Sequence, residues 1–99
     1  MPLAITGVAA VVRWAYYDAA VVHGYRIGRD DAQQWHVRAT VIHVNRVNLE
    51  LGRGALVFVA THQGGEWTWP IESYTLTENL FTARLGPPDT GSHVPLRHA

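Results

Sequence analysis

The run Gly64-Gly65-Glu66-Trp67-Thr68-Trp69-Pro70 constrains the fold of this chain more than any other stretch. Two consecutive glycines accept the positive φ angles of a tight hairpin turn, and the alternation that follows places Trp67 and Trp69 on one face of a strand. Pro70 lacks a backbone N–H, so we expect it to end the pairing of that strand. The run predicts a hairpin in which both tryptophans anchor the core or an interface.

Length and composition favour one domain with a thin polar surface. The chain has 99 residues, enough for a single modest core. Charged residues make up 16% of it, below the roughly 25% typical of globular domains, and hydrophobic residues make up 47%. This balance predicts self-association or a protein partner. The formal net charge is zero, which argues against nucleic-acid binding.

Alternating or continuous apolar runs predict about six strands. The clearest is 34–44, where apolar and polar residues alternate. The predicted strands cover residues 3–14, 34–44, 55–60, 66–70, 71–76 and 79–85.

A single short helix is expected between the first two of these strands. Asp18 can cap it and Gly24 can end it in a left-handed conformation. The alternative is one long helix over residues 8–23, which the β-branched valines disfavour.

These patterns predict a mainly β fold, namely a single small antiparallel β-barrel or sandwich of about six strands with at most one short helix. We expect a globular domain in residues 1–86 and a flexible C-terminal tail in residues 87–99, which contain three prolines. Arg13 and Asp18 interrupt the apolar run 8–22, so we expect no membrane span and no signal peptide. The lack of cysteine excludes disulfides and is compatible with a cytoplasmic protein.

Two sets of residues are candidates for ligand binding. His36 and Arg38, with Thr40 on the same strand face, can form a small anion or phosphate site, although the same pattern is typical of a solvated strand face. The tryptophans Trp35, Trp67 and Trp69 can stack nucleic-acid bases on an exposed sheet, or they can fill the core.

Residues 55–60 are apolar on both faces, which predicts a central strand covered on both sides. If Leu56 and Phe58 point into the core, Ala55, Val57 and Val59 need a second cover. The expected short helix or a second subunit can supply it, and we favour the second subunit because the helix is short.

The sequence offers little for catalysis or metal binding. The six histidines lack the spacing of metal ligands, and Ser73 and Ser92 lie outside any nucleophile motif. We therefore expect no metal and no cofactor. An enzyme that uses His36 or His62 as a general base remains the least favoured alternative.

The segments Trp35 to Val41, Leu56 to Ala60, Gly65 to Ile71 and Phe81 to Pro88 together resemble small uncharacterised β-rich proteins of prophages and other mobile genetic elements. The Trp-x-Trp-Pro run and the Leu-Gly-Pro-Pro ending carry the resemblance, which spans residues 5–88 and implies a genomic setting but no activity. The sequence predicts a non-enzymatic interaction module that acts by protein contact as a homo-oligomer. The alternative is a sheet-face nucleic-acid-binding module that uses Arg38 and Arg84.

Overall fold

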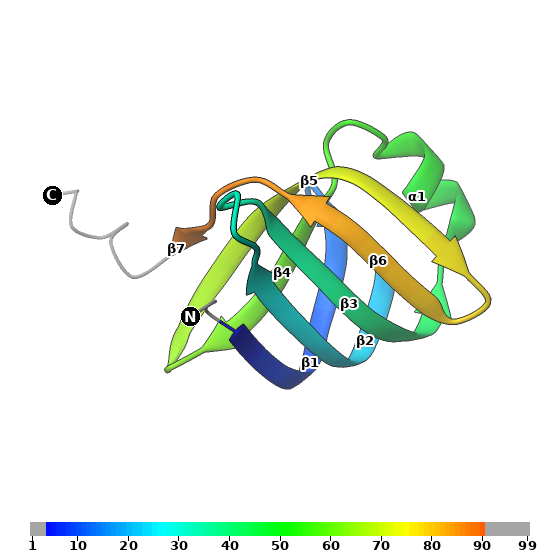
Figure 1. The fold of residues 1–99 in the computed structure, drawn as a ribbon. Helices are drawn as coiled ribbons and strands as arrows, with labels where there is room; N and C mark the ends of the chain where they lie inside the picture. The colour runs from blue at the N-terminus through cyan, green and yellow to red at the C-terminus, as the bar shows by residue number, and fades with distance from the viewer. Residues whose placement is uncertain (1–3, 91–99) are drawn as a thin grey trace, which may run out of the picture.

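Two three-stranded meanders joined by one short helix build the part of the chain that the structure, a computed structural model, describes, residues 4–90 (Figure 1). The first meander contains β1 (Ala4–Trp14), β2 (Tyr17–Arg29) and β3 (Trp35–Val44). Helix α1 (Arg46–Leu51) leads into the second, which contains β4 (Val57–His62), β5 (Gly65–Thr77) and β6 (Leu80–Leu85).

The two meanders join along two seams and close into a barrel. Antiparallel pairing runs in the order β4-β1-β2-β3-β6-β5, and β5 pairs with β4 to complete the ring. One seam pairs Val11 of β1 with Val59 of β4, and the other pairs Trp35 of β3 with Leu85 of β6. The predicted mainly β fold of about six antiparallel strands with one short helix is therefore confirmed.

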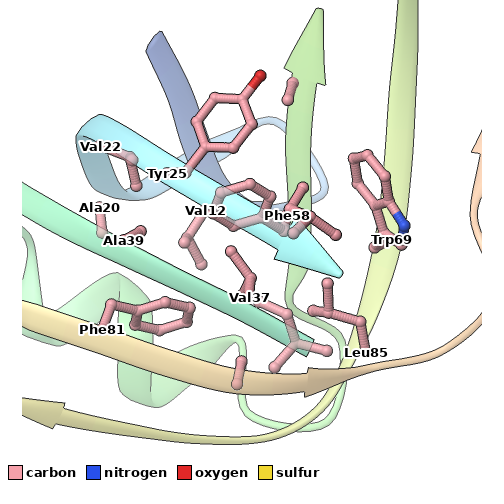
Figure 2. Close-up of a cluster of buried hydrophobic side chains, with 14 of the residues drawn as sticks. Val12, Ala20, Val22, Tyr25, Val37, Ala39, Phe58, Trp69, Phe81 and Leu85 are labelled. Atoms are coloured by element: carbon pink, nitrogen blue, oxygen red, sulfur yellow. The ribbon is translucent and has the colours of Figure 1, made fainter. Parts of the chain in front are cut away.

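The core is the inner face of this ring. Val12, Phe58, Trp69, Phe81 and Leu85 are fully buried there, and Figure 2 shows side chains from several strands converging between the ribbons. The ring of Phe58 lies 6.4 Å from that of Trp69, in an edge-to-face arrangement that aromatic pairs favour. The predicted common face of Trp67 and Trp69 is confirmed, since their rings lie 5.6 Å apart, with Trp69 buried and Trp67 half-buried.

The helix expected from Asp18 to Gly24 is wrong, and so is its longer alternative over residues 8–23. These residues belong to β1 and β2, and Ala20 and Val22 point into the barrel core. Val22 pairs with both Ala10 and Val41, so β-branched residues of this segment lie in the sheet, where they pack well. Gly24, with φ at 101°, lies at a register shift in β2 instead of ending a helix.

The only helix in residues 4–90 is instead α1, which lies between the strands predicted at 34–44 and 55–60. The Asn45 side chain accepts a hydrogen bond from the Asn48 backbone N–H at 3.0 Å, which caps the first turn. Leu49 is buried against the barrel, and Gly52 follows the last turn.

The hairpin between β4 and β5 forms at the predicted place with a different turn. Positive φ angles fall on Gln63 and Gly64, at 52° and 79°, and Gly65 already begins β5. Pro70 does not end β5, which continues to Thr77. At Pro70 the strand exchanges partners, since β4 pairs with it up to Pro70 and β6 pairs with it from Ile71 onward.

The tail expected from residue 87 begins close to the sheet. Asp89 and Thr90 form the two-residue strand β7, which pairs with Thr68 and Trp67 of β5. The remainder of that expected tail, residues 91–99, lies outside the described residues.

Candidate functional site

Polar side chains gather on the outer face of four neighbouring strands, β2, β3, β6 and β5. On β3 the predicted alternation is confirmed, because Trp35 and Val37 are buried while His36 and Arg38 are exposed. We name this surface the arginine face, and its side chains are those of Arg26, His36, Arg38, Ser73, Thr75, Thr82 and Arg84.

The strand register arranges the arginine face in two rows across the sheet. The first row contains Gly28, His36, Arg84 and Ser73. The second row contains Arg26, Arg38, Thr82 and Thr75. Each row crosses four strands, so the side chains of a row are close neighbours although they come from distant parts of the sequence.

Arg26 and Arg38 are direct partners across the β2–β3 pair, and both are exposed. Directly opposed side chains on neighbouring antiparallel strands have Cβ atoms about 4.5–5.5 Å apart, and like charges in such positions are destabilising. No ion pair among residues 4–90 involves either guanidinium. The second row therefore holds two positive charges that the described part of the chain does not neutralise.

Arg84 is held in the first row by a relay of hydrogen bonds. Its Nη2 donates to Oε1 of Gln34 at 3.0 Å, and Nε2 of Gln34 donates to the carbonyl oxygen of Leu85 at 2.8 Å. In the second row, the hydroxyls of Thr75 and Thr82 lie 2.6 Å apart. These contacts fix the β6 and β5 side of the face.

His36 is paired with a carboxylate at the end of the face. Its Nε2 lies 2.9 Å from Oδ2 of Asp30, and Asp30 also accepts backbone hydrogen bonds from Gln34 and Ala32. The Gln34 N–H and then the His36 side chain lower the pKa of the Asp30 carboxyl below its usual value. Asp30 therefore carries its negative charge, and this end of the face is less positive than the second row.

The arginine face is also concave. A shallow groove of about 590 Å³ opens over it. A smaller depression of about 200 Å³ extends it toward Thr40 and Leu80, and Arg26 and Arg38 line both. The two arginines thus lie where the two hollows meet.

The candidate binding residues lie in three different places. His36 and Arg38 lie on the arginine face, and Arg84 lies beside them. Trp35 and Trp69 lie in the core with ring centroids 6.1 Å apart, so they offer no exposed stacking surface. Trp67 is half-buried beside His62, whose ring lies 5.4 Å from it.

Arg26 is the arginine of the second row that the sequence did not predict, and Thr75 and Thr82 were not predicted either. The predicted strands leave out the segment around Arg26, because the residues before it were assigned to a helix. A signal was present, since Arg26 stands between the apolar residues Tyr25 and Ile27 as Arg38 stands between Val37 and Ala39. Their pairing across strands depends on register, which the bulge at Gly24 shifts by one residue.

The three candidate interface residues lie near β4, away from the arginine face. Ala55 precedes the strand and is exposed, Val57 is half-buried, and Val59 is buried between its partners Val11 and Thr68. β4 is flanked by β1 and β5, as expected for a central strand.

The Asp30–His36 pair has the form of an oriented general base, but within residues 4–90 His36 makes no hydrogen bond to a hydroxyl group. Ser73 is the serine of the same row, and it lies two strands from His36, about 10 Å away at the usual strand spacing. A proton transfer needs heavy atoms within hydrogen-bond reach or one intervening water. The arrangement is better suited to holding a charged group than to activating Ser73.

No protein-family model matches the chain, and no match was found among curated proteins or solved structures. No cluster of three metal-ligating side chains occurs within residues 4–90. Over the same range, no helix has the length and apolar content needed to cross a bilayer.

Proposed function

We propose that this chain is a non-enzymatic β-barrel binding module and that it holds an anionic partner on the arginine face. The observation that carries the proposal is the direct opposition of Arg26 and Arg38 at the junction of two hollows, with no acidic partner for either among residues 4–90.

The physical reason is the energy of two like charges on neighbouring strands. Their repulsion opposes folding, and a bound anion would remove it while accepting charge-assisted hydrogen bonds from both guanidiniums. Arginine forks suit carboxylate and phosphate oxygens, and exposed hydroxyls in the same rows can donate to the same group. Zero net charge does not oppose this, because the positive charge is local.

Backbone NMR with inorganic phosphate tests the proposal. At matched ionic strength, phosphate should shift the resonances around Arg26 and Arg38 in a saturable way, while chloride should not. Replacing Arg38 by Gln should reduce these shifts, whereas Arg46→Gln removes a charge from exposed α1 and should leave them unchanged. Equal, unsaturated shifts over the whole surface would refute an anion site on this face.

Self-association is a second candidate function, supported by the apolar surface of α1. Val47 and Leu51 lie four residues apart on the helix and are 68% and 65% exposed. Tyr16, in the turn before β2, is 96% exposed, and Asn48 ties α1 to the start of β2 through the carbonyl oxygen of Asp18. These residues offer an apolar surface for protein contact.

Light scattering tests this second candidate. A dimer mass that falls to the monomer mass in Leu51→Glu, with unchanged circular dichroism, would support it. A monomeric parent chain at high concentration would refute it.

A further inference from the structure

We infer that the arginine face selects a phosphomonoester dianion, with the phosphate held between Arg26 and Arg38. This inference rests on the proposed anion-binding function and names the class of ligand for the same site.

The second row presents two guanidiniums at a single position of the sheet. Arg26 and Arg38 are register partners, and both line the groove and its extension. A carboxylate or a phosphodiester carries one negative charge, so it would leave one of the two positive charges uncompensated. A phosphomonoester carries about −1.5 to −2 charges at pH 7 and presents three acceptor oxygens, so it matches both arginines.

The charges of the first row favour a ligand that carries one phosphate over a ligand that carries several consecutive phosphates. The basic side chains of this row are those of Arg84 and His36, but Arg84 already donates to Gln34, and His36 lies 2.9 Å from the Asp30 carboxylate. Glu72 also approaches this end, because Gln34 Nε2 lies 3.4 Å from its carboxylate. A second phosphate, one row along the strands, would therefore meet less positive charge than the first.

The surroundings of the second row also fit the organic part of a phosphate ester. The extension of the groove leads from Arg26 and Arg38 to Thr40 and the partly exposed apolar side chain of Leu80. The rings of Trp35 and Trp69 are buried, and Tyr74, which lines the groove, is half-buried and stacks on Phe81. These rings of the described chain therefore give little exposed surface on which nucleic-acid bases could stack. A small ester or a terminal phosphate fits this chemistry better than a run of bases.

Methyl phosphate and dimethyl phosphate are the matched probes, because they differ in the number of ionisable oxygens. At pH 7.5 and low ionic strength, NMR titration of the arginine side-chain N–H groups should give at least about tenfold tighter binding of methyl phosphate, the effect of one charge-assisted interaction. Equal affinities would overturn the inference but leave the proposed anion site intact. The absence of any saturable shift at Arg26 and Arg38 would overturn both.

The pH dependence of this preference distinguishes selection of a phosphate dianion from general attraction of anions to the arginines. The second pKa of a phosphomonoester is about 6, so the preference for methyl phosphate should fall toward unity as the pH is lowered to about 5. At that pH, a positive charge on His36 would attract both esters alike and leave their ratio unchanged, and Arg84, Asp30 and Glu72 are the other charged groups at that end. A preference for methyl phosphate that persists unchanged at pH 5 would contradict the inference.

Variants of Arg26 and Arg38 test whether these two arginines cause the preference for the dianion. Arg26→Gln and Arg38→Gln should each remove the preference for the dianion, while Arg46→Gln should retain it. Arg38→Lys keeps the charge without the fork and should weaken methyl phosphate binding several-fold, with the spectrum of a folded protein as the check. Retention of the preference in Arg26→Gln would refute the two-arginine site.

Two natural forms of the same group then distinguish the source of the phosphate. A nucleoside 5′-monophosphate and free phosphoserine carry the same dianion on different organic groups. If one of these two esters binds more tightly than methyl phosphate and loses that binding in Arg26→Gln, the result would support the site and identify the source of the phosphate. Binding of either ester that is unaffected by Arg26→Gln would place it elsewhere and contradict the inference.

Discussion

Gly7 of β1 lies directly against the phenol ring of Tyr25, its register partner on β2. A Cβ atom at position 7 would overlap the Tyr25 hydroxyl and the ring carbon that bears it. Tyr25 is itself buried, with its ring 5.6 Å from that of Phe58, so the ring has little freedom to move away. The glycine is needed here for space.

Gly7→Ala should therefore lower the free energy of unfolding by about 1–3 kcal/mol, the usual effect of overpacking a core. Urea unfolding followed by fluorescence measures it. Thr6→Ala, on the exposed side of the same strand, is the control and should change stability by less than about 0.5 kcal/mol. If Gly7→Ala is as stable as the parent, Tyr25 does not fill this space.

The two tryptophans of β5 should differ in their contribution to stability. Trp69 is fully buried, so Trp69→Ala should cost about 3–5 kcal/mol, and Trp67→Ala should cost less because Trp67 is half-buried. Trp69→Phe should cost less than Trp69→Ala, because the Trp69 indole N–H has no hydrogen-bond partner within residues 4–90 to lose. Thermal unfolding of the three variants measures the order, and a larger loss for Trp67→Ala would contradict it.

Strand periodicity made the barrel predictable, because β3 and β6 alternate clearly and the turn at Gln63 and Gly64 joins two apolar runs. It failed at β2, where the bulge at Gly24 breaks the alternation, so that Val22 and Tyr25 point inward without sharing parity. The same shift hid the pairing of Arg26 with Arg38. His36 and Arg38 of the arginine face could be predicted from one strand, whereas the assembly of the other side chains beside them depends on contacts between strands distant in sequence.

The cap of α1 gives a local test of why this helix forms at 46–51. Asn45→Ala removes the acceptor for the Asn48 N–H and should destabilise the protein by about 1 kcal/mol. Asn45→Asp retains an acceptor and should restore most of the loss. Chemical denaturation measures both, and equal stabilities for the two variants would show that the cap contributes nothing.

Asp30 should give a stability change in acid. Hydrogen bonds from the Gln34 N–H and the His36 side chain lower the pKa of Asp30 in the folded state below its usual value, so the ionised form stabilises the fold fully above the unfolded pKa. That contribution is lost as the pH falls through the folded pKa. The stability difference between the parent and Asp30→Asn should therefore be constant at neutral pH and shrink below about pH 4.

Urea midpoints measured from pH 7 to pH 2 test this, with Asp31→Asn as the control for a neighbouring exposed carboxylate. NMR titration of the Asp30 side chain gives the pKa directly. A measured Asp30 pKa above the usual aspartate value of 3.8 would show that the hydrogen bonds from Gln34 and His36 do not lower it.

The two seams of the barrel determine the order in which the chain can fold. The first meander can pair locally, but its inner face stays open until β4 reaches β1 and β6 reaches β3. Trp35 cannot pair with Leu85 until β6 has formed, and Leu85 lies near the end of the described chain. During synthesis, a half-formed barrel with Val12, Val22 and Val37 uncovered must therefore persist until the second meander emerges. Such long-range closure is typical of domains that fold in milliseconds to seconds, so the exposed half-barrel is the species most prone to aggregate.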